Sequence, residues 1–111
     1  MSVYGGGDWK DAFYAVQRGD LALLKYHIDQ GIDLDFQHAE AFSTLLLESI
    51  EQEHVSIARL LLENGANPAK AEGYSGITPL KLAKTKKNKE LVQLIKSFLP
   101  KKSIFFDVFS S

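Results

Sequence analysis

Residues of the same kind recur along this chain at intervals of 34 positions. Gly31 and Gly65 are separated by this interval, and so are Thr44 and Thr78. Further pairs at the same spacing indicate three copies within the 111 residues. A period of this length is typical of a solenoid, in which one supersecondary unit stacks on the next. A single unit cannot bury its apolar side alone, so the sequence predicts a stack of three.

The middle copy, residues 44–68, indicates what one unit contains. Leu45, Leu46 and Ile50 recur at helical spacing, and residues 57–62 form a second apolar helical run. Residues 52–54 are a polar break between the two runs. Gly65 and Pro68 then provide a helix stop. The unit is therefore predicted to be an antiparallel pair of helices.

The flanking copies carry helix signals of their own. A first helix is expected from Trp9 to about Gly19, and Asp20 is expected to be the N-cap of the next helix. In the third copy, Thr78 is a predicted N-cap and Pro79 occupies the first turn, where a missing N–H costs nothing. One position in the first helix of each copy stays small, which allows neighbouring helices to lie close together: Ala15, Ser49 and Ala83.

The connectors decide between two kinds of helical array. Tetratricopeptide repeats also have a period of 34, but short turns join their helices. Here the connectors 31–43 and 65–77 are long, and the second contains Gly65, Pro68, Gly73 and Gly76. Such a segment cannot be helical. We expect both connectors to project from the helices as hairpin-like fingers.

At these residues the chain resembles the ankyrin repeat family. Thr78-Pro79-Leu80 matches the helix-opening motif of that family, with Ala83 at its small position. Further matches fall in the second helix and its exit: His54, Ile57, Leu60, Leu61, Gly65, Ala66 and Asn67. The resemblance covers roughly residues 10–99. It implies an all-α, ankyrin-like solenoid of three helix-loop-helix repeats with projecting finger loops, and it makes His54 a structural residue that bonds loop backbone.

The first and last copies depart from the family pattern. Lys10-Asp11-Ala12 stands where the opening motif of the first copy belongs, and Lys87 replaces the usual glycine between the helices of the last copy, as Glu53 does in the middle one. We therefore interpret them as divergent terminal repeats. The expected organisation is a flexible leader at 1–8, a repeat domain at 9–99 and a tail at 100–111. The repeats fall at about 9–36, 37–70 and 71–99.

The tail concentrates apolar residues after a proline. Pro100 ends the last helix, and the residues that follow include Ile104, Phe105, Phe106, Val108 and Phe109. The end of a solenoid needs a cover because stacking stops there. The tail is therefore expected to cap the last repeat. The alternative is a docking segment, or a contact for weak self-association of an otherwise monomeric chain.

Composition limits the classes of function. Residues 1–65 hold 4 Lys and Arg against 11 Asp and Glu, whereas residues 66–111 hold 9 against 3. This asymmetry concerns partners rather than fold. The chain has no cysteine, which excludes disulfides and thiolate zinc sites. With no signal pattern and no membrane-length apolar run, the expected location is the cytoplasm.

We expect no catalytic residue, no cofactor and no metal. The histidines are dispersed, and His38 with Glu40 offers only two possible metal ligands. Ser43 and Ser75 lack a paired base. The glycines form no phosphate-binding pattern. The lysines between 84 and 89 are interpreted as a solvated turn, because the overall charge of −1 does not suit a nucleic-acid partner.

What remains is binding. In the ankyrin family a concave face of inner helices and fingers contacts partner proteins, and the resemblance assigns this face to Trp9, Tyr14, Gln17, Arg18, Glu40, Ala41, Ser43, Glu48, Glu51, Gln52, Tyr74, Ser75, Ile77, Leu82, Thr85 and Lys86. Trp9, Tyr14 and Tyr74 are of the types that dominate binding hot spots. Trp9 has a second interpretation, as a cover for the exposed end of the first copy.

The sequence therefore predicts a non-enzymatic protein–protein interaction module, such as a scaffold. Two alternatives stay open. One is an immunity or inhibitor-type protein that occludes the active site of an enzyme. The other is a structural protein whose acidic amino-terminal part meets the basic carboxy-terminal part of the next copy, head to tail.

Overall fold

Six α-helices make up the regular secondary structure of the described residues. The computed structural model describes residues 6–37 and 43–100. Its helices are α1 (Gly6–Arg18), α2 (Leu21–Asp29), α3 (Leu45–Glu51), α4 (Val55–Glu63), α5 (Pro79–Thr85) and α6 (Lys89–Phe98). The all-α architecture predicted from the sequence is confirmed.

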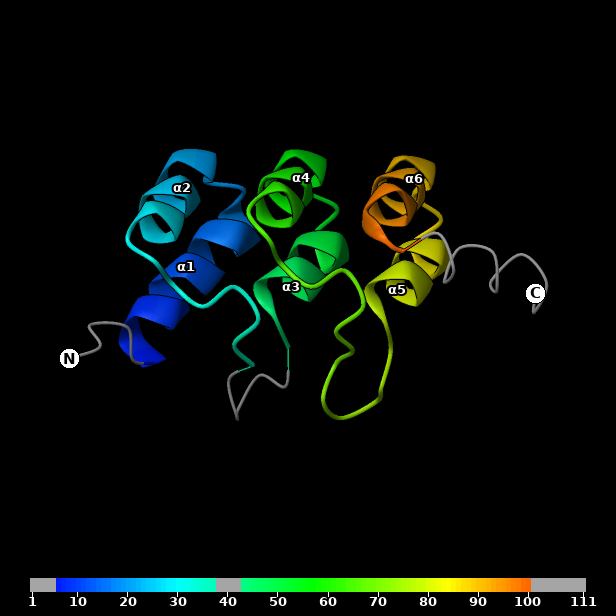
Figure 1. The fold of residues 1–111 in the computed structure, drawn as a ribbon, viewed down its shortest axis with the longest axis horizontal. Helices are drawn as coiled ribbons and strands as arrows, with labels where there is room; N and C mark the ends of the chain where they lie inside the picture. The colour runs from blue at the N-terminus through cyan, green and yellow to red at the C-terminus, as the bar shows by residue number, and fades with distance from the viewer. Residues whose placement is uncertain (1–5, 38–42, 101–111) are drawn as a thin grey trace.

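The helices form two rows joined by projecting loops (Figure 1). Within each repeat the helices pack as pairs, α1 with α2, α3 with α4 and α5 with α6. Between repeats, α1 packs on α3 and α3 on α5, while α2 packs on α4 and α4 on α6. The inner row is therefore α1–α3–α5 and the outer row is α2–α4–α6. The second connector, 65–77, leaves the rows as a projecting loop, as the sequence predicted, and the described part of the first connector leaves on the same side of the molecule (Figure 1).

Side-chain caps fix where four of the helices begin. The oxygens of Asp20, Thr44, Thr78 and Asn88 each accept a hydrogen bond from the backbone N–H three residues later. Such a bond satisfies one of the free donors of the first turn. The predicted caps Asp20 and Thr78 are confirmed. α1 begins at Gly6 rather than at Trp9, so residues 6–8 of the expected leader belong to this helix.

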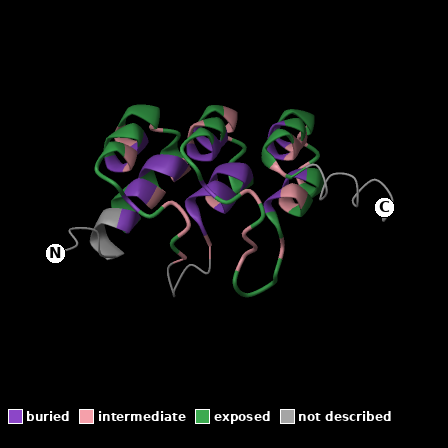
Figure 2. Ribbon diagram, viewed as in Figure 1, coloured by how far each residue is buried: buried purple, intermediate pink, exposed green. Residues whose placement is uncertain are grey.

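The core is one continuous strip between the two rows (Figure 2). The three small residues Ala15, Ser49 and Ala83 are fully buried in the inner row. Because they are small, α1, α3 and α5 can approach one another closely. The Ser49 hydroxyl donates to the carbonyl of Leu46 within its own helix, at 2.6 Å, which satisfies its buried polar group.

The turn between the helices of each repeat passes through a left-handed residue. These residues are Gly19, Glu53 and Lys87, with φ of 73°, 58° and 57°. A Cβ on Gly19 would lie only 3.2 Å from the His54 ring of the next repeat. The His54 Nε2 lies 3.1 Å from the carbonyl oxygen of Gln17, in the last turn of α1. The His54 side chain therefore links the second repeat to the first, although its partner is a carbonyl at the end of α1 and not the loop backbone that the resemblance implied.

Candidate partner-binding surface

Trp9 lies in the core and does not contribute to the exposed surface. It is 3% exposed. Its ring stacks on Phe13 at 4.8 Å between centroids and meets Phe36 edge-on at 5.7 Å. No earlier repeat stacks on α1 in the part of the chain that is described, and these aromatics cover that end of the core. The assignment of Trp9 to the binding face is corrected accordingly, in favour of its second interpretation.

A row of polar side chains crosses the inner helices at Glu48. The Glu48 Oε2 accepts hydrogen bonds from the Gln17 Nε2 of the first repeat at 3.2 Å and from the Gln52 Nε2 at 2.9 Å. Both donors are neutral amides, so they orient the carboxylate and leave its charge in place. Glu48 is thereby fixed as a negative group in the middle of the inner row.

An ion pair continues this row into the third repeat. The Lys86 Nζ lies 2.8 Å from the Glu51 Oε2. This hydrogen bond to the Glu51 carboxylate raises the pKa of Lys86 above its usual 10.5. Glu51 of the second repeat and Lys86 of the third are thus joined by a direct contact between repeats.

The tip of the second finger is an ordered turn built on Glu72. Its backbone N–H donates to the carbonyl of Ile77 at 2.8 Å, and its own carbonyl accepts from Gly76 at 2.9 Å. The Glu72 Oε1 accepts from the backbone N–H of Tyr74 at 2.9 Å and from the Ser75 hydroxyl at 2.7 Å. Hydrogen bonds from Ser75, and then from Tyr74, hold the pKa of Glu72 below its usual 4.5.

This turn presents Tyr74 to solvent. Tyr74 is 85% exposed, more than any other large hydrophobic residue of the described chain. Because its backbone is held by the Glu72 carboxylate, the aromatic ring projects from an ordered position. The sequence singled out Tyr74 and Ser75 but missed Glu72. An acid directly before the glycine-bounded run Gly73-Tyr74-Ser75-Gly76 was the available signal.

Hydrogen bonds also join the two fingers. The Asp35 Oδ1 accepts from the backbone N–H of Asn67 at 2.7 Å, and the Gln37 Nε2 donates to the carbonyl of Ala71 at 3.1 Å. A finger that was bonded only within itself would be free to swing. These contacts instead tie the second finger to the first and limit its movement.

The other assigned residues differ in exposure. Tyr14 on α1 is 53% exposed, and Arg18, Glu51, Gln52, Ser75 and Thr85 are also exposed. Half-buried positions are Gln17, Ser43, Glu48, Ile77, Leu82 and Lys86. Glu40 and Ala41 lie outside the described residues, as do His38 and the segment 101–111.

The described residues contain no candidate metal-binding site. No group of three or more His, Cys, Asp or Glu side chains comes together among them. The described helices also include none that is long and apolar enough to cross a membrane. The lysines between 84 and 89 lie at the turn from α5 to α6, where the sequence placed them.

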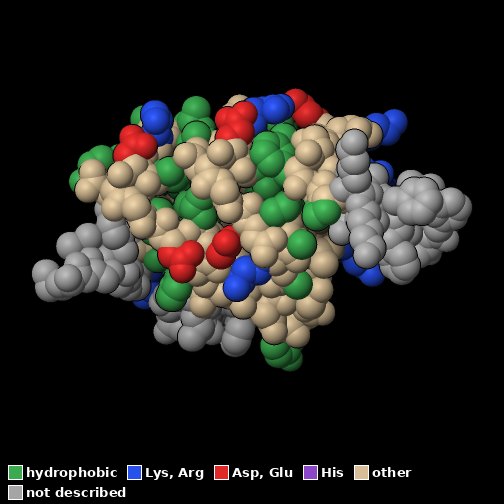
Figure 3. All heavy atoms as spheres, viewed as in Figure 1, with side chains coloured by type: hydrophobic (Ala, Val, Ile, Leu, Met, Phe, Trp, Pro, Cys, Tyr) green, Lys and Arg blue, Asp and Glu red, His purple; other side chains and the backbone are tan. Residues whose placement is uncertain are grey.

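Charges of both signs are mixed on the face of the molecule seen in Figure 3. Acidic and basic side chains alternate along its upper side, over the outer helices, with hydrophobic side chains between them. One such pair on α2 joins Lys25 to Asp29 at 3.6 Å. Exposed pairs of this kind contribute little to stability. The outer row also carries an exposed aromatic residue, Tyr26 on α2, which is 56% exposed against 85% for Tyr74.

Comparisons with known proteins agree with this architecture. A family model described as ankyrin repeats, in three copies, matches residues 12–103. A solved ankyrin repeat domain from Acinetobacter baumannii superposes with a TM-score of 0.73 and 30% identity, over 78% of this chain and 46% of that one. The chain therefore belongs to the ankyrin repeat family.

Two curated relatives share part of the chain. One is a fowlpox virus protein named as an ankyrin repeat protein, which is 36% identical over 61 residues. The other is the nuclear factor NF-kappa-B p105 subunit of Gallus gallus, 32% identical over 82 residues. These matches cover 55% and 74% of this chain but only 9% and 8% of the relatives. Ankyrin repeats are generally non-enzymatic protein–protein interaction modules.

Proposed function

We propose that this protein binds a partner protein through its concave face, the inner row of helices together with the fingers. The observation that carries the proposal is Tyr74, 85% exposed on a fingertip whose backbone is fixed by Glu72. An aromatic residue whose backbone is already ordered before binding loses less conformational freedom on binding. A free loop of the same sequence would lack this advantage.

The charged side chains of the inner row favour a partner whose charged groups are complementary to them in sign and position. Glu48 is a fixed negative group, and the Glu51–Lys86 pair joins the second repeat to the third. Tyr14 adds a second exposed aromatic residue on α1. We expect a partner that presents a basic side chain to Glu48 and an apolar pocket to Tyr74. Association of this kind weakens as salt rises.

The test is capture of partners from the lysate of the source cell at low salt, with identification by mass spectrometry. Three baits are compared: the unchanged chain, Tyr74→Ala and Tyr26→Ala. Tyr26 is a matched control because it is a tyrosine that is 56% exposed on α2, in the outer row. We expect a partner that Tyr74→Ala loses by at least about tenfold in affinity, which corresponds to roughly 1.4 kcal/mol, and that Tyr26→Ala keeps.

Each other outcome changes the conclusion. If only the Tyr26→Ala variant fails to capture the partner, the binding site lies on the outer row. Equal retention by both variants excludes the two tyrosines as anchors and overturns the role of Tyr74. If the unchanged chain captures only its own copies, head-to-tail self-assembly replaces the proposal. If the captured partner is an enzyme, its activity with and without the chain decides whether binding is inhibitory.

A further inference from the structure

The three repeats allow a comparison of the same positions with and without a following repeat. Leu46, Ile50 and Ala58 of the middle repeat are buried, and so are Ala12, Val16 and Leu24 at the equivalent places of the first repeat. The equivalents in the third repeat, Leu80, Lys84 and Val92, are half-buried or exposed. These are thus the positions that a following repeat covers. In the third repeat they form an end face that no other described helix covers, on the side of α5 and α6 away from α3 and α4.

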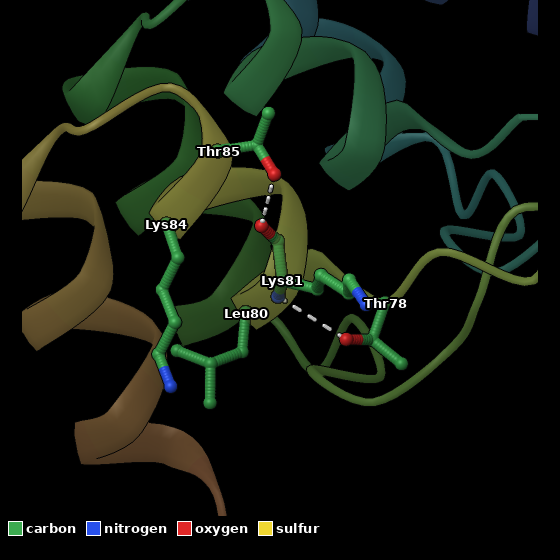
Figure 4. Close-up of a pocket in the computed structure, with 5 residues that line it drawn as sticks. All are labelled: Thr78, Leu80, Lys81, Lys84 and Thr85. Carbon is green, nitrogen blue, oxygen red and sulfur yellow. Dashed lines mark hydrogen bonds between the residues drawn. The ribbon is translucent and has the colours of Figure 1, made fainter. Parts of the chain in front are cut away.

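Two adjoining grooves mark this end face. One has a volume of about 530 Å³ and is lined by Thr78, Leu80, Lys81, Lys84 and Thr85 (Figure 4). In this view the side chains of Leu80 and Lys84 project side by side from α5. The second groove, of about 430 Å³, shares Lys84 and adds Lys87, Lys89, Val92 and Gln93. The end face therefore has an apolar floor with lysines around it.

The lysines argue against a fourth repeat as the cover. Lys81 and Lys84 stand where the middle repeat has Leu47 and Ile50, which are 2% and 0% exposed. A repeat stacked in the usual way would bury both ammonium groups, which is costly without close anionic partners. A segment thinner than a repeat can cover the apolar part of the end face without burying these lysines. It places apolar side chains on Leu80 and Val92 and leaves the lysine ammonium groups at its margin.

We propose that residues 104–109, Ile-Phe-Phe-Asp-Val-Phe, dock on this end face in the same molecule. Five of these six residues are apolar, and Asp107 supplies a negative charge for Lys81 and Lys84. The segment also begins a short way beyond α6. Leu99 follows α6 and packs against the core, and Ile104 comes five residues later, a reach of about 16 Å at 3.3 Å per residue. The end face meets the concave face at Thr85, but docking on it does not depend on the proposed function.

The chain offers a direct test because it has no cysteine. A Ser110→Cys variant carries a single nitroxide spin label, and methyl signals are compared before and after chemical reduction of the label. We expect strong broadening at Leu80 and Val92. Matched control methyls are Ala12 and Leu24, the same positions in the first repeat, where no broadening is expected. Adding Phe105→Ser and Phe106→Ser to the labelled chain is expected to abolish the broadening and to lower the urea midpoint of unfolding.

Other occupants give distinct results. Labelled chain is mixed with isotope-enriched chain that carries no label. Broadening of Leu80 and Val92 in that mixture, rising with concentration, assigns the end face to a second copy and overturns docking within one molecule. Absence of broadening at these methyls in the single-labelled chain overturns it as well. An Asp107→Lys variant tests the charge: weakened broadening supports a contact with Lys81 and Lys84, and unchanged broadening removes Asp107 from the contact.

Discussion

Lys87 holds a backbone conformation that suits glycine better. Its φ is 57°, in the turn between α5 and α6, where the first repeat has Gly19. A residue other than glycine loses roughly 1–2 kcal/mol of stability when its φ is positive in this way. Glycine avoids this strain but loses more conformational entropy on folding, which offsets part of the gain. Lys87→Gly is therefore expected to raise the free energy of unfolding by about 0.5–1 kcal/mol, measured by urea denaturation.

The control for Lys87→Gly is the same substitution at a helical residue. Gln93 is exposed on α6. Gln93→Gly is expected to lower the free energy of unfolding by somewhat under about 1 kcal/mol, since glycine disfavours a helix interior. A lower stability for both variants would show that Lys87 is not strained in the folded state.

His27 is a buried polar residue at a position where the other repeats are apolar. It is 5% exposed, and its equivalents 34 and 68 positions later are Leu61 and Ile95. Its Nδ1 has no hydrogen-bond partner among the described residues. A buried polar atom left in this way costs about 1–3 kcal/mol. His27→Leu is therefore expected to raise the urea midpoint, and the reverse change, Leu61→His, to lower it. A lower midpoint for His27→Leu would mean that the imidazole is bonded in solution.

At the scale of elements, the second finger depends on one ionised carboxylate. The lowered pKa of Glu72 means that the folded tip favours the charged form. Its contribution is therefore complete above the usual value of 4.5 and is lost as the pH falls through the lower, folded pKa. The amide signals of Tyr74 and Ser75 are expected to titrate with a midpoint below 4.5.

A change at Ser75 provides the comparison for this titration. Ser75→Ala removes the hydroxyl that donates to Glu72 but keeps the backbone donors. The midpoint is expected to move up toward 4.5 in this variant. A midpoint at or above 4.5 in the unchanged chain would contradict the contacts at the fingertip.

Helix boundaries were predictable because their causes are local. Asp20, Thr78 and Pro79 act within a single turn of their own helices, so a short window of sequence contains the signal. The 34-residue spacing then supplied the stacking order. The bonds from Asp35 to Asn67 and from Gln37 to Ala71 join different fingers. Nothing in either segment alone indicates such a partner.

Trp9 shows why burial at the end of a stack is harder to predict. An aromatic residue on a helix that has a neighbour on one side only fits both a core and a binding face. The choice depends on whether another segment covers it, and here Phe13 and Phe36 do so. Tyr74 and Tyr14 share the same residue class, yet both are more than half exposed. Residue type identified Trp9, Tyr14 and Tyr74 as candidates for the binding face, and packing determined which of them are buried and which are exposed.

For the whole molecule, the contacts between repeats are expected to control cooperativity. Ile50 is fully buried, while its equivalent in the last repeat is Lys84. Ile50→Lys places a charge between the second and third repeats and is expected to cost at least about 3 kcal/mol. Hydrogen exchange should then accelerate in α5 and α6 before it does in α1 and α2. Equal acceleration in all six helices would indicate that the repeats unfold only together.

The neighbour-to-neighbour packing also determines how the molecule would respond to tension. The main helix contacts join each repeat to the next along the chain, with the middle repeat held on both sides. A force applied at the two ends is therefore carried in series by the two junctions between repeats. Such a chain is expected to extend in steps of one repeat, with the outer repeats detaching before the middle one. The end-to-end length of such a stack therefore increases one repeat at a time under load, and it decreases again when the repeats restack after the load is removed.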